Sequence, residues 1–353
     1  MIENMMREHL KEFTNYIVPD NDYKYVLNAN ESPFSLFDIP VLKDILLEKI
    51  KNYNSNLYPE GTSRVLRNSI SNYTGVPADS IICGNGSDEL IPMIFNCFLN
   101  PGEAVVSHYP SFDMYKVGTQ IARGRFFPIN DLADHSIDVD SMIKTANEQS
   151  AKIIFVCVPN NPTGYFLEKS QVERIINETN SIVVLDEAYV DFSKYNCLDL
   201  IEKHERLIIL RTLSKALGMA GLRVGYALGQ QKMIDILNKV KQPYNLNSLS
   251  QLIASTALDN FDLLKDNISL IASERDYMMS ELKKIPNIQV FDSQANFILI
   301  RVPDGEKTNK ALLEESIFLK YYGQKPSLEN CFRITVSTRK INDLVLSTLK
   351  AIW

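Results

Sequence analysis

Short runs of consecutive apolar residues alternate with helical patterns through the middle of the chain. The runs lie at residues 81–83, 104–106, 153–158, 182–185, 207–210 and 224–228. Helical spacing separates several of them, as at Val172, Ile175 and Ile176. Strands that are apolar on both faces are typical of a parallel sheet covered by helices on both sides. The pattern therefore predicts a large α/β domain with a mainly parallel sheet, which we place at residues 40–245.

The pattern changes beyond Pro243. Two long amphipathic stretches, 249–258 and 263–282, precede apolar runs at 288–290, 296–300 and 332–336 and a final helical pattern from Asn342. This order of helices, strands and helix predicts a smaller α+β domain at residues 246–353. Residues 1–39 mix short polar pieces with aromatic side chains, and we interpret them as an N-terminal arm packed on the smaller domain.

Composition and charge narrow the possible classes of protein. The 353 residues are 45% hydrophobic and carry a formal net charge of -6 without a dense cluster of lysine and arginine, which argues against binding to nucleic acid. No apolar run approaches the roughly 20 residues of a membrane span, and the N-terminus does not resemble a signal peptide, so we expect a cytoplasmic protein. The five cysteines form no CxxC pair and the four histidines have no metal-binding spacing, so we expect free thiols and no metal site.

Polar residues follow the predicted strands where parallel sheets bind ligands, outside the carboxyl ends of the strands. Lys215 follows the run at 207–210. A buried lysine can become a neutral amine that attacks carbonyls and forms Schiff bases. Alternatively, Lys215 ends an element and reaches water. Asp186 ends an apolar run and would be costly to bury without a cation, such as a protonated pyridine nitrogen. Alternatively, it begins a helix or binds magnesium.

A glycine-rich turn at 84–86 precedes a helical pattern that begins with Ser87 and Asp88. Backbone amides at the start of a helix bind phosphate, and Arg223, Thr212 and Ser214 can add charge and hydroxyl groups. Each of these features also has a purely structural interpretation. The glycine-rich turn can be an ordinary turn, residues 161–164 can form a β-turn, and Arg223 can be a surface residue paired with an acid. Those interpretations do not explain why a lysine, an acid and a phosphate cradle occur together in this order.

The ordered motifs resemble those of the fold-type I pyridoxal-phosphate aminotransferases, and within them the chain is similar to the histidinol-phosphate aminotransferase subfamily. The resemblance covers nearly the whole chain and rests on residues 28–31, 58–60, 84–89, 160–164, 186–192, 212–216, 221–223, 243–247, 296–297 and 333–336. It implies an aspartate-aminotransferase-like fold with helices on both faces of the large sheet. It also implies pyridoxal 5'-phosphate bound as a Schiff base on Lys215.

The resemblance further implies the role of each matching residue. Lys215 then moves the proton between the substrate and the cofactor, Asp186 keeps the ring nitrogen protonated, and Asn161 and Tyr189 bond the ring's phenolic oxygen. Phe112 matches the aromatic residue that stacks on the ring, although it also fits an ordinary core position. The cofactor phosphate is expected to contact Ser87, Asp88, Thr212, Ser214 and Arg223. Tyr58 matches a tyrosine that reaches this phosphate from the other subunit, which implies a homodimer with shared active sites.

Substrate recognition is where the chain departs from the subfamily. Arg333 matches the arginine that holds the substrate anion, but Lys320 occupies the position of a second arginine that helps to hold the substrate phosphate. Lysine keeps the charge and loses planar, bidentate recognition. Tyr16 is a candidate for a further contact with the same group.

The resemblance implies transamination between L-histidinol phosphate and 2-oxoglutarate, giving imidazole-acetol phosphate and L-glutamate in histidine biosynthesis. An aromatic amino-acid aminotransferase and an L-threonine-O-3-phosphate decarboxylase remain alternatives. A non-catalytic cofactor-sensing regulator is a more distant one, because the residues before Asn28 are not basic as a DNA-binding domain would be. The expected partners are a small amino donor and a 2-oxo acid.

Overall fold

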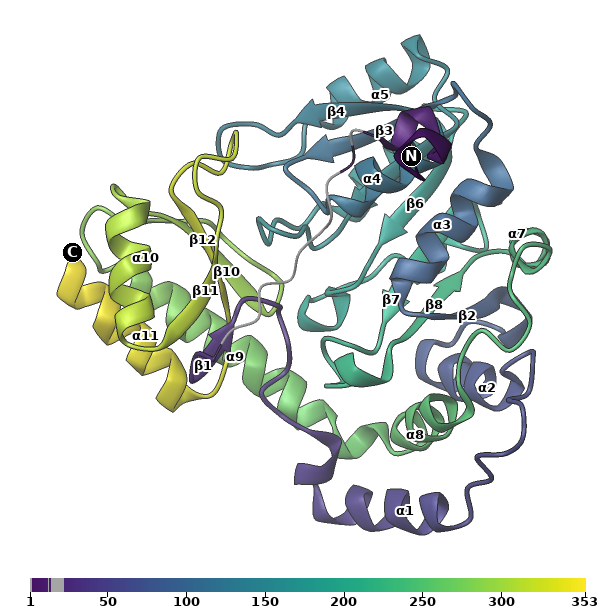
Figure 1. The fold of residues 1–353 in the computed structure, drawn as a ribbon, viewed down its shortest axis with the longest axis horizontal. Coiled ribbons are helices and arrows are strands. Elements are labelled where there is room, and N and C mark those ends of the chain that lie inside the picture. The colour runs from purple at the N-terminus through teal and green to yellow at the C-terminus, as the bar shows by residue number, and fades with distance from the viewer. Residues whose placement is uncertain (1, 12, 14–21) are drawn as a thin grey trace.

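The computed structural model describes residues 2–11, 13 and 22–353, and these form two sheets with helices around them (Figure 1). The larger sheet has seven strands in the order β2-β8-β7-β6-β5-β3-β4. Their bounds are Ile81–Asn85 (β2), Ala104–Tyr109 (β3), Arg125–Asn130 (β4), Ile153–Cys157 (β5), Ile182–Asp186 (β6), Leu207–Thr212 (β7) and Val224–Leu228 (β8). All neighbours pair in parallel except β8, which is antiparallel to both β2 and β7.

The smaller sheet has five strands in the order β1-β11-β12-β10-β9. Their bounds are Tyr25–Leu27 (β1), Gln289–Val290 (β9), Phe297–Arg301 (β10), Ile317–Tyr321 (β11) and Cys331–Thr335 (β12). Strand β1 pairs in parallel with β11, so residues 25–27 belong to the smaller sheet, whereas residues 2–10 lie beside the larger sheet (Figure 1). The domain boundaries at 39/40 and 245/246 stay a prediction.

The helices lie around both sheets (Figure 1). Their bounds are Pro40–Lys51 (α1), Arg64–Thr74 (α2), Ser87–Phe98 (α3), Met114–Ile121 (α4), Val139–Glu148 (α5), Lys169–Asn177 (α6), Gln231–Asn238 (α7), Ser248–Asp259 (α8), Lys265–Leu282 (α9), Gly305–Glu314 (α10) and Arg339–Ile352 (α11). Side-chain caps start three of them: Asp138 accepts from the Ser141 amide at α5, Asn247 accepts from the Ser250 amide at α8, and Asp304 accepts from the Lys307 amide at α10. Within the described residues, no helix has both the length and the apolar character needed to cross a membrane.

The larger sheet is buried on both faces, as its continuous apolar strands predict. Along β7, Leu207 and Ile209 belong to one hydrophobic core, while Ile208 and Leu210 belong to a second core on the opposite face. Successive side chains of a strand point to opposite faces, so this division follows directly from the pleat. Strand β4 is not among the predicted strands. It contains Pro128 and lies at the edge of the sheet, where proline is tolerated.

Candidate active site

Four strands of the larger sheet end at one edge, and the polar residues that follow them meet there. Asp186 is the last residue of β6 and pairs with Cys157 of β5 on one side and with Leu210 of β7 on the other. Lys215 comes shortly after β7, and Asn161 follows β5. Because β2, β5, β6 and β7 run in the same direction, their carboxyl ends share this edge. The topology therefore gathers the residues that the sequence places at separate strand ends.

Lys215 contacts the N-terminal part of the chain at Ala29. Its Nζ donates a hydrogen bond to the carbonyl oxygen of Ala29 at 2.7 Å. Burial lowers the pKa of Lys215 to about 8, and the positive charges of Arg333 and Arg223 act in the same direction, while Glu31 opposes them. A lysine in these surroundings supplies a neutral amine near neutral pH, which is the form that reacts with an aldehyde.

Asp186 is 3% exposed and lies deep at the same edge. The Tyr115 hydroxyl donates to its Oδ2 at 2.6 Å, and the Ala188 amide donates to its Oδ1 at 3.1 Å. Burial raises the pKa of Asp186 to about 6 despite these hydrogen bonds. No ion pair in the described part of the chain includes this carboxyl group. A buried acid without a cation fits a protonated pyridine nitrogen, because that cation would repay the cost of burying its charge.

The glycine-rich turn after β2 approaches β8 very closely. A Cβ on Gly225 would lie 2.5 Å from the carbonyl carbon of Gly86 and 2.6 Å from the amide nitrogen of Ser87. Gly86 has a φ of 79°, a conformation that favours glycine, and it directly precedes helix α3. The first amides of α3 are therefore exposed at the end of this turn, which is the usual geometry for holding a phosphate group.

Hydroxyl and guanidinium groups surround this turn. Thr212 Oγ1 donates to Ser214 Oγ at 2.9 Å, and Arg223 Nη2 donates to Asp88 Oδ2 at 2.8 Å. A Cβ on Gly86 would meet Arg223 Nη2 at 2.8 Å, so the guanidinium group lies against the turn. Thr212 pairs with Gly225 in the sheet. The predicted phosphate-binding residues thus lie together around one cradle.

Tyr189 and Asn161 lie on the side of the site that faces the smaller domain. The Tyr189 hydroxyl accepts a hydrogen bond from Asn30 Nδ2 at 3.0 Å. Asn161 Oδ1 accepts a hydrogen bond from Arg333 Nη1, and Arg333 Nη2 donates to the Asn28 carbonyl oxygen at 2.5 Å. Arg333 Nε is buried without a hydrogen-bond partner in the described part of the chain. Arg333 thus connects the smaller sheet with Asn161 at the edge of the larger sheet.

Lys320 accompanies Arg333 on the smaller sheet. The two residues are register partners on β11 and β12, and directly opposite residues share one face of a sheet. Burial lowers the pKa of Lys320, and the nearby charges of Arg333 and Lys325 lower it further, while Asp113 opposes them. Asp113 lies between β3 of the larger sheet and α4, so Lys320 lies where the smaller sheet approaches the larger one. Tyr16, the other predicted anion contact, lies outside the described residues.

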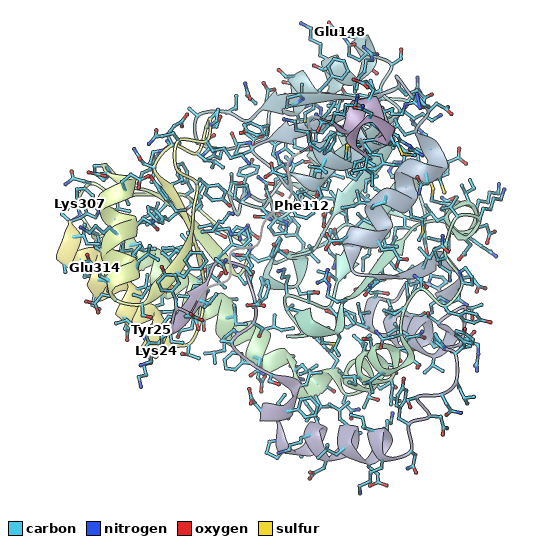
Figure 2. The ribbon with its side chains drawn as sticks, viewed as in Figure 1. Lys24, Tyr25, Phe112, Glu148, Lys307 and Glu314 are labelled. Atoms are coloured by element: carbon cyan, nitrogen blue, oxygen red, sulfur yellow. The ribbon has the colours of Figure 1, made fainter. Side chains whose placement is uncertain are left out.

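Phe112 and Tyr58 differ in how they relate to this site. Phe112 lies centrally in the view of Figure 2, and its ring packs edge-on against Tyr115 with centroids 5.6 Å apart. Through Tyr115 it is connected to Asp186. Tyr58 is 82% exposed, stacks on Tyr244 at 4.7 Å and lines a surface pocket with Asn85 and Tyr244. Its exposure agrees with the prediction that it serves a second subunit, which stays a prediction.

Two contacts in the site have no counterpart in the reasoning from sequence. Tyr115 bonds Asp186, and Asn30 bonds Tyr189. Asn30 lies in a stretch that carries the family resemblance, 28–31, and Tyr115 lies three residues after the matched Phe112, but nothing in their local pattern assigns them a partner. The spacing of Phe112 and Tyr115, which places both near the start of α4, is the one available signal.

The fold and the arrangement of lysine, aspartate and glycine-rich turn fit a pyridoxal-phosphate-dependent enzyme. The family model for aminotransferase class I and II matches residues 23–349. The chain is 43% identical over 350 residues to the histidinol-phosphate aminotransferase of Thermoanaerobacter sp. (strain X514), covering 99% of both chains. It is 40% identical over 352 residues to that of Caldanaerobacter subterraneus subsp. tengcongensis, covering 100% of this chain and 99% of the other.

A solved structure gives the same result for the fold. The histidinol-phosphate aminotransferase of Sinorhizobium meliloti, in complex with pyridoxal-5'-phosphate, matches with a TM-score of 0.88 and 21% identity over 98% of this chain and 97% of the other. The chain belongs to the aminotransferase class I and II family. The predicted family, fold class, enzyme class and cofactor are therefore confirmed.

Proposed function

We propose that this enzyme transfers an amino group between L-histidinol phosphate and 2-oxoglutarate, giving imidazole-acetol phosphate and L-glutamate in histidine biosynthesis. The observation that carries the choice of substrate is the 43% identity with a histidinol-phosphate aminotransferase over 99% of both chains. The paired cations Lys320 and Arg333 on one face of the smaller sheet support it, because the donor carries a phosphate group.

Pyridoxal phosphate, when bound, supplies an aldehyde that captures the donor amine and a ring that withdraws electrons from the donor's reacting carbon. Lys215 Nζ would hold this aldehyde and would take and return the proton, since its lowered pKa leaves a large neutral fraction near pH 8. Asp186 would keep a proton on the ring nitrogen. Asn161 and Tyr189 would bind the phenolic oxygen, and Phe112 would contact the ring.

The remaining predicted contacts hold the two phosphate groups. The amides of Ser87 and Asp88, with the side chains of Thr212, Ser214 and Arg223, hold the cofactor phosphate, together with Tyr58 of the partner subunit in a homodimer. Arg333 and Lys320 hold the phosphate of the donor and the carboxylate of the 2-oxo acid in turn. We further propose a cytoplasmic location, on the grounds given by the sequence.

A donor panel tests this function. Purified enzyme with 2-oxoglutarate is given L-histidinol phosphate, phenylalanine, tyrosine or O-phosphothreonine, and glutamate and carbon dioxide are measured. We expect glutamate formation with the highest kcat/KM for L-histidinol phosphate and no carbon dioxide. A preference for phenylalanine would assign an aromatic aminotransferase, and carbon dioxide from O-phosphothreonine would assign a decarboxylase. The Lys215→Ala variant is the control for turnover that does not involve the site.

A further inference from the structure

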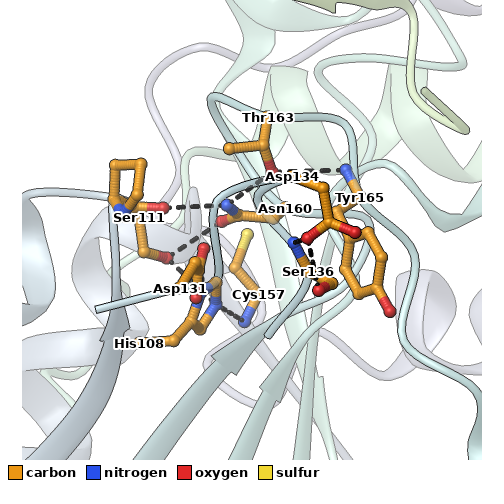
Figure 3. A network of polar contacts seen from close by, with 10 residues as sticks. His108, Ser111, Asp131, Asp134, Ser136, Cys157, Asn160, Thr163 and Tyr165 are labelled. Atoms are coloured by element: carbon orange, nitrogen blue, oxygen red, sulfur yellow. Dashed lines mark hydrogen bonds and ion pairs between the residues drawn. The ribbon is translucent and has the colours of Figure 1, made fainter. Parts of the chain in front are cut away.

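A buried polar network connects the end of β3 with the loop that follows β5 (Figure 3). His108 is 1% exposed, and its Nδ1 lies 3.2 and 3.3 Å from the two carboxylate oxygens of Asp131. Both side chains of this pair are fully buried. Neither residue has a role in the chemistry proposed above, and placing a histidine and an acid in the interior is costly unless their hydrogen bonds are made.

The surroundings of His108 determine which ring nitrogen carries the proton. Its Nε2 lies 3.4 Å from the backbone nitrogen of Cys157, and a backbone amide can act only as a donor. Nε2 therefore accepts, so the proton is on Nδ1 and is donated to Asp131. The parallel pairing of β3 and β5 ends at Ser107 and Phe155. The His108 ring thus accepts a hydrogen bond from a backbone amide just beyond the last paired residues of the two strands.

The network continues through Ser111 to Asn160. Ser111 Oγ lies 3.4 Å from His108 Nε2 and donates to Asn160 Oδ1 at 3.0 Å. Asn160 is fully buried, and its Nδ2 donates to the Pro110 carbonyl oxygen and to Thr163 Oγ1, both at 2.9 Å. These two bonds fix the orientation of the amide and leave its oxygen to accept from Ser111.

The residues Ser111, His108 and Asp131 are not arranged as a catalytic triad. A triad needs a serine that donates its proton to the histidine. Here the single hydroxyl proton of Ser111 goes to Asn160, and Nε2 already accepts from the Cys157 amide. The network therefore has no activated nucleophile, and its function has to be structural support of something nearby.

Three residues that we propose to contact the cofactor are direct neighbours of residues in this network, in sequence or across paired strands. Ser111 directly precedes Phe112, and Asn160 directly precedes Asn161. Cys157, whose amide bonds His108, is the register partner of Asp186 in β6. The segments that carry Phe112 and Asn161 are thus joined to each other and to the sheet through His108 and Asn160 (Figure 3).

We propose that His108 is a positioning residue: its neutral ring, oriented by Asp131, holds the 109–113 and 158–165 segments so that Phe112 and Asn161 meet the cofactor ring correctly. This inference rests on the proposed function, because it presupposes that Phe112 and Asn161 contact the ring. His108 touches neither substrate nor cofactor and acts through Ser111, Asn160 and the Cys157 amide.

The test compares His108→Leu with His108→Gln in the full-length holoenzyme. Leucine removes both hydrogen bonds, whereas glutamine can place an oxygen near Nε2 to accept from Cys157. We expect His108→Leu to weaken the visible circular dichroism of the bound cofactor, raise the dissociation constant for pyridoxal phosphate about fivefold and lower kcat about tenfold, with KM changed less than twofold. His108→Gln should restore most of the dichroism and of kcat.

His135→Leu is the matched control. His135 is 4% exposed, lies four residues after Asp131, packs against Phe291 with ring centroids 4.6 Å apart, and has no hydrogen-bond partner for its buried Nε2 among the described residues. It should lower thermal stability while leaving the dichroism and cofactor affinity unchanged. If His108→Leu and His135→Leu gave the same dichroism, affinity and kcat, or if glutamine restored nothing, His108 would have no positioning role.

Ser111→Ala tests the inference if His108→Leu does not fold. This change removes one half-buried hydroxyl group and separates His108 from Asn160. It should reduce the cofactor dichroism and lower kcat about threefold, whereas unchanged values would overturn the inference. Failure of the proposed function looks different: wild-type protein would then bind no pyridoxal phosphate or Lys215→Ala would retain turnover, whatever the result at His108.

Discussion

The edge of the larger sheet and the facing surface of the smaller sheet hold their charges in different ways. At the edge, Asp186 and Thr212 end neighbouring strands that are each paired on both sides, and their side chains are short and buried. On the smaller sheet, Lys320 and Arg333 extend long side chains from an antiparallel pair. Arg333 reaches across to Asn161 and Asn28, while Lys320 forms no ion pair within the described part of the chain.

This difference indicates which part of the reaction each region controls. Short side chains on paired strands lose little freedom when a ligand binds, so they suit chemistry that requires fixed geometry. Long cationic side chains have many rotamers and adapt to different anions. We therefore expect changes at the sheet edge to lower kcat, and changes at the smaller sheet to raise KM or alter the choice of donor.

The largest effect should come from Lys215→Ala. Removing the amine takes away both the covalent attachment and the proton carrier, so kcat should fall at least ~10^4-fold. Stopped-flow absorbance after mixing holoenzyme with donor measures the step directly. Lys215→Arg is the control that keeps a positive charge. A turnover rate above about a tenth of the wild-type rate would exclude Lys215 from the chemistry.

The next largest effect on activity should come from Asp186→Asn. The substitution keeps the shape but cannot stabilise a protonated ring nitrogen, so kcat should fall about 10^3-fold with little change in donor KM. Because burial already raises the pKa of Asp186 to about 6, the cofactor-free variant should fold normally. Tyr115→Phe, which removes one hydrogen bond to the carboxyl group, serves as the milder comparison. An equal effect of the two variants would contradict the assigned role.

Uptake of pyridoxal phosphate should depend on pH through Lys215. Burial lowers its pKa to about 8, so the neutral fraction falls about tenfold per pH unit below that value. The rate at which cofactor-free protein binds pyridoxal phosphate should therefore rise from pH 6 and level off above pH 8. A rate that kept rising beyond pH 10 would indicate an unperturbed lysine. Free lysine under the same conditions is the reference.

Arg333→Lys should affect substrate binding more than catalysis. Lysine keeps the charge but cannot form two parallel hydrogen bonds with an anion, so KM for the donor and for 2-oxoglutarate should rise about 30-fold. Steady-state kinetics with kcat and KM separated give the result. Lys320→Arg is the reciprocal change and should lower KM for the phosphorylated donor. If Arg333→Lys lowered kcat and left KM unchanged, the proposed difference between the edge of the larger sheet and the surface of the smaller sheet would be wrong.

The smallest effect should come from the ion pair between the domains. Lys325 Nζ lies 3.0 Å from both carboxylate oxygens of Asp113, and Tyr109 donates to the Pro326 carbonyl oxygen beside it. Such partly exposed pairs contribute little to stability. Lys325→Met should therefore change kcat/KM about threefold and thermal stability only slightly. A change of more than about tenfold for the phosphorylated donor alone would place Lys325 in the anion site.

Much of the large domain could be predicted from sequence because its signals are local. The apolar runs correspond to β2, β3, β5, β6, β7 and β8, and the glycine-rich turn precedes α3 as expected. Strands β1, β4 and β11 are not among the predicted ones. In β11, Lys320 and Tyr321 interrupt the apolar pattern, and only its pairing with β1 and β12 makes it a strand.

The sequence by itself determined the class of fold and supplied the candidate residues for the chemistry, since strand period, turn glycines and the order of motifs are properties of short stretches. Tertiary structure alone decided that Tyr115 bonds Asp186, that Asn30 bonds Tyr189 and that His108 connects the segments carrying Phe112 and Asn161. These contacts join residues 71, 159 and 49 positions apart. Their partners depend on how strands are ordered and paired in space, which local patterns along the chain do not encode.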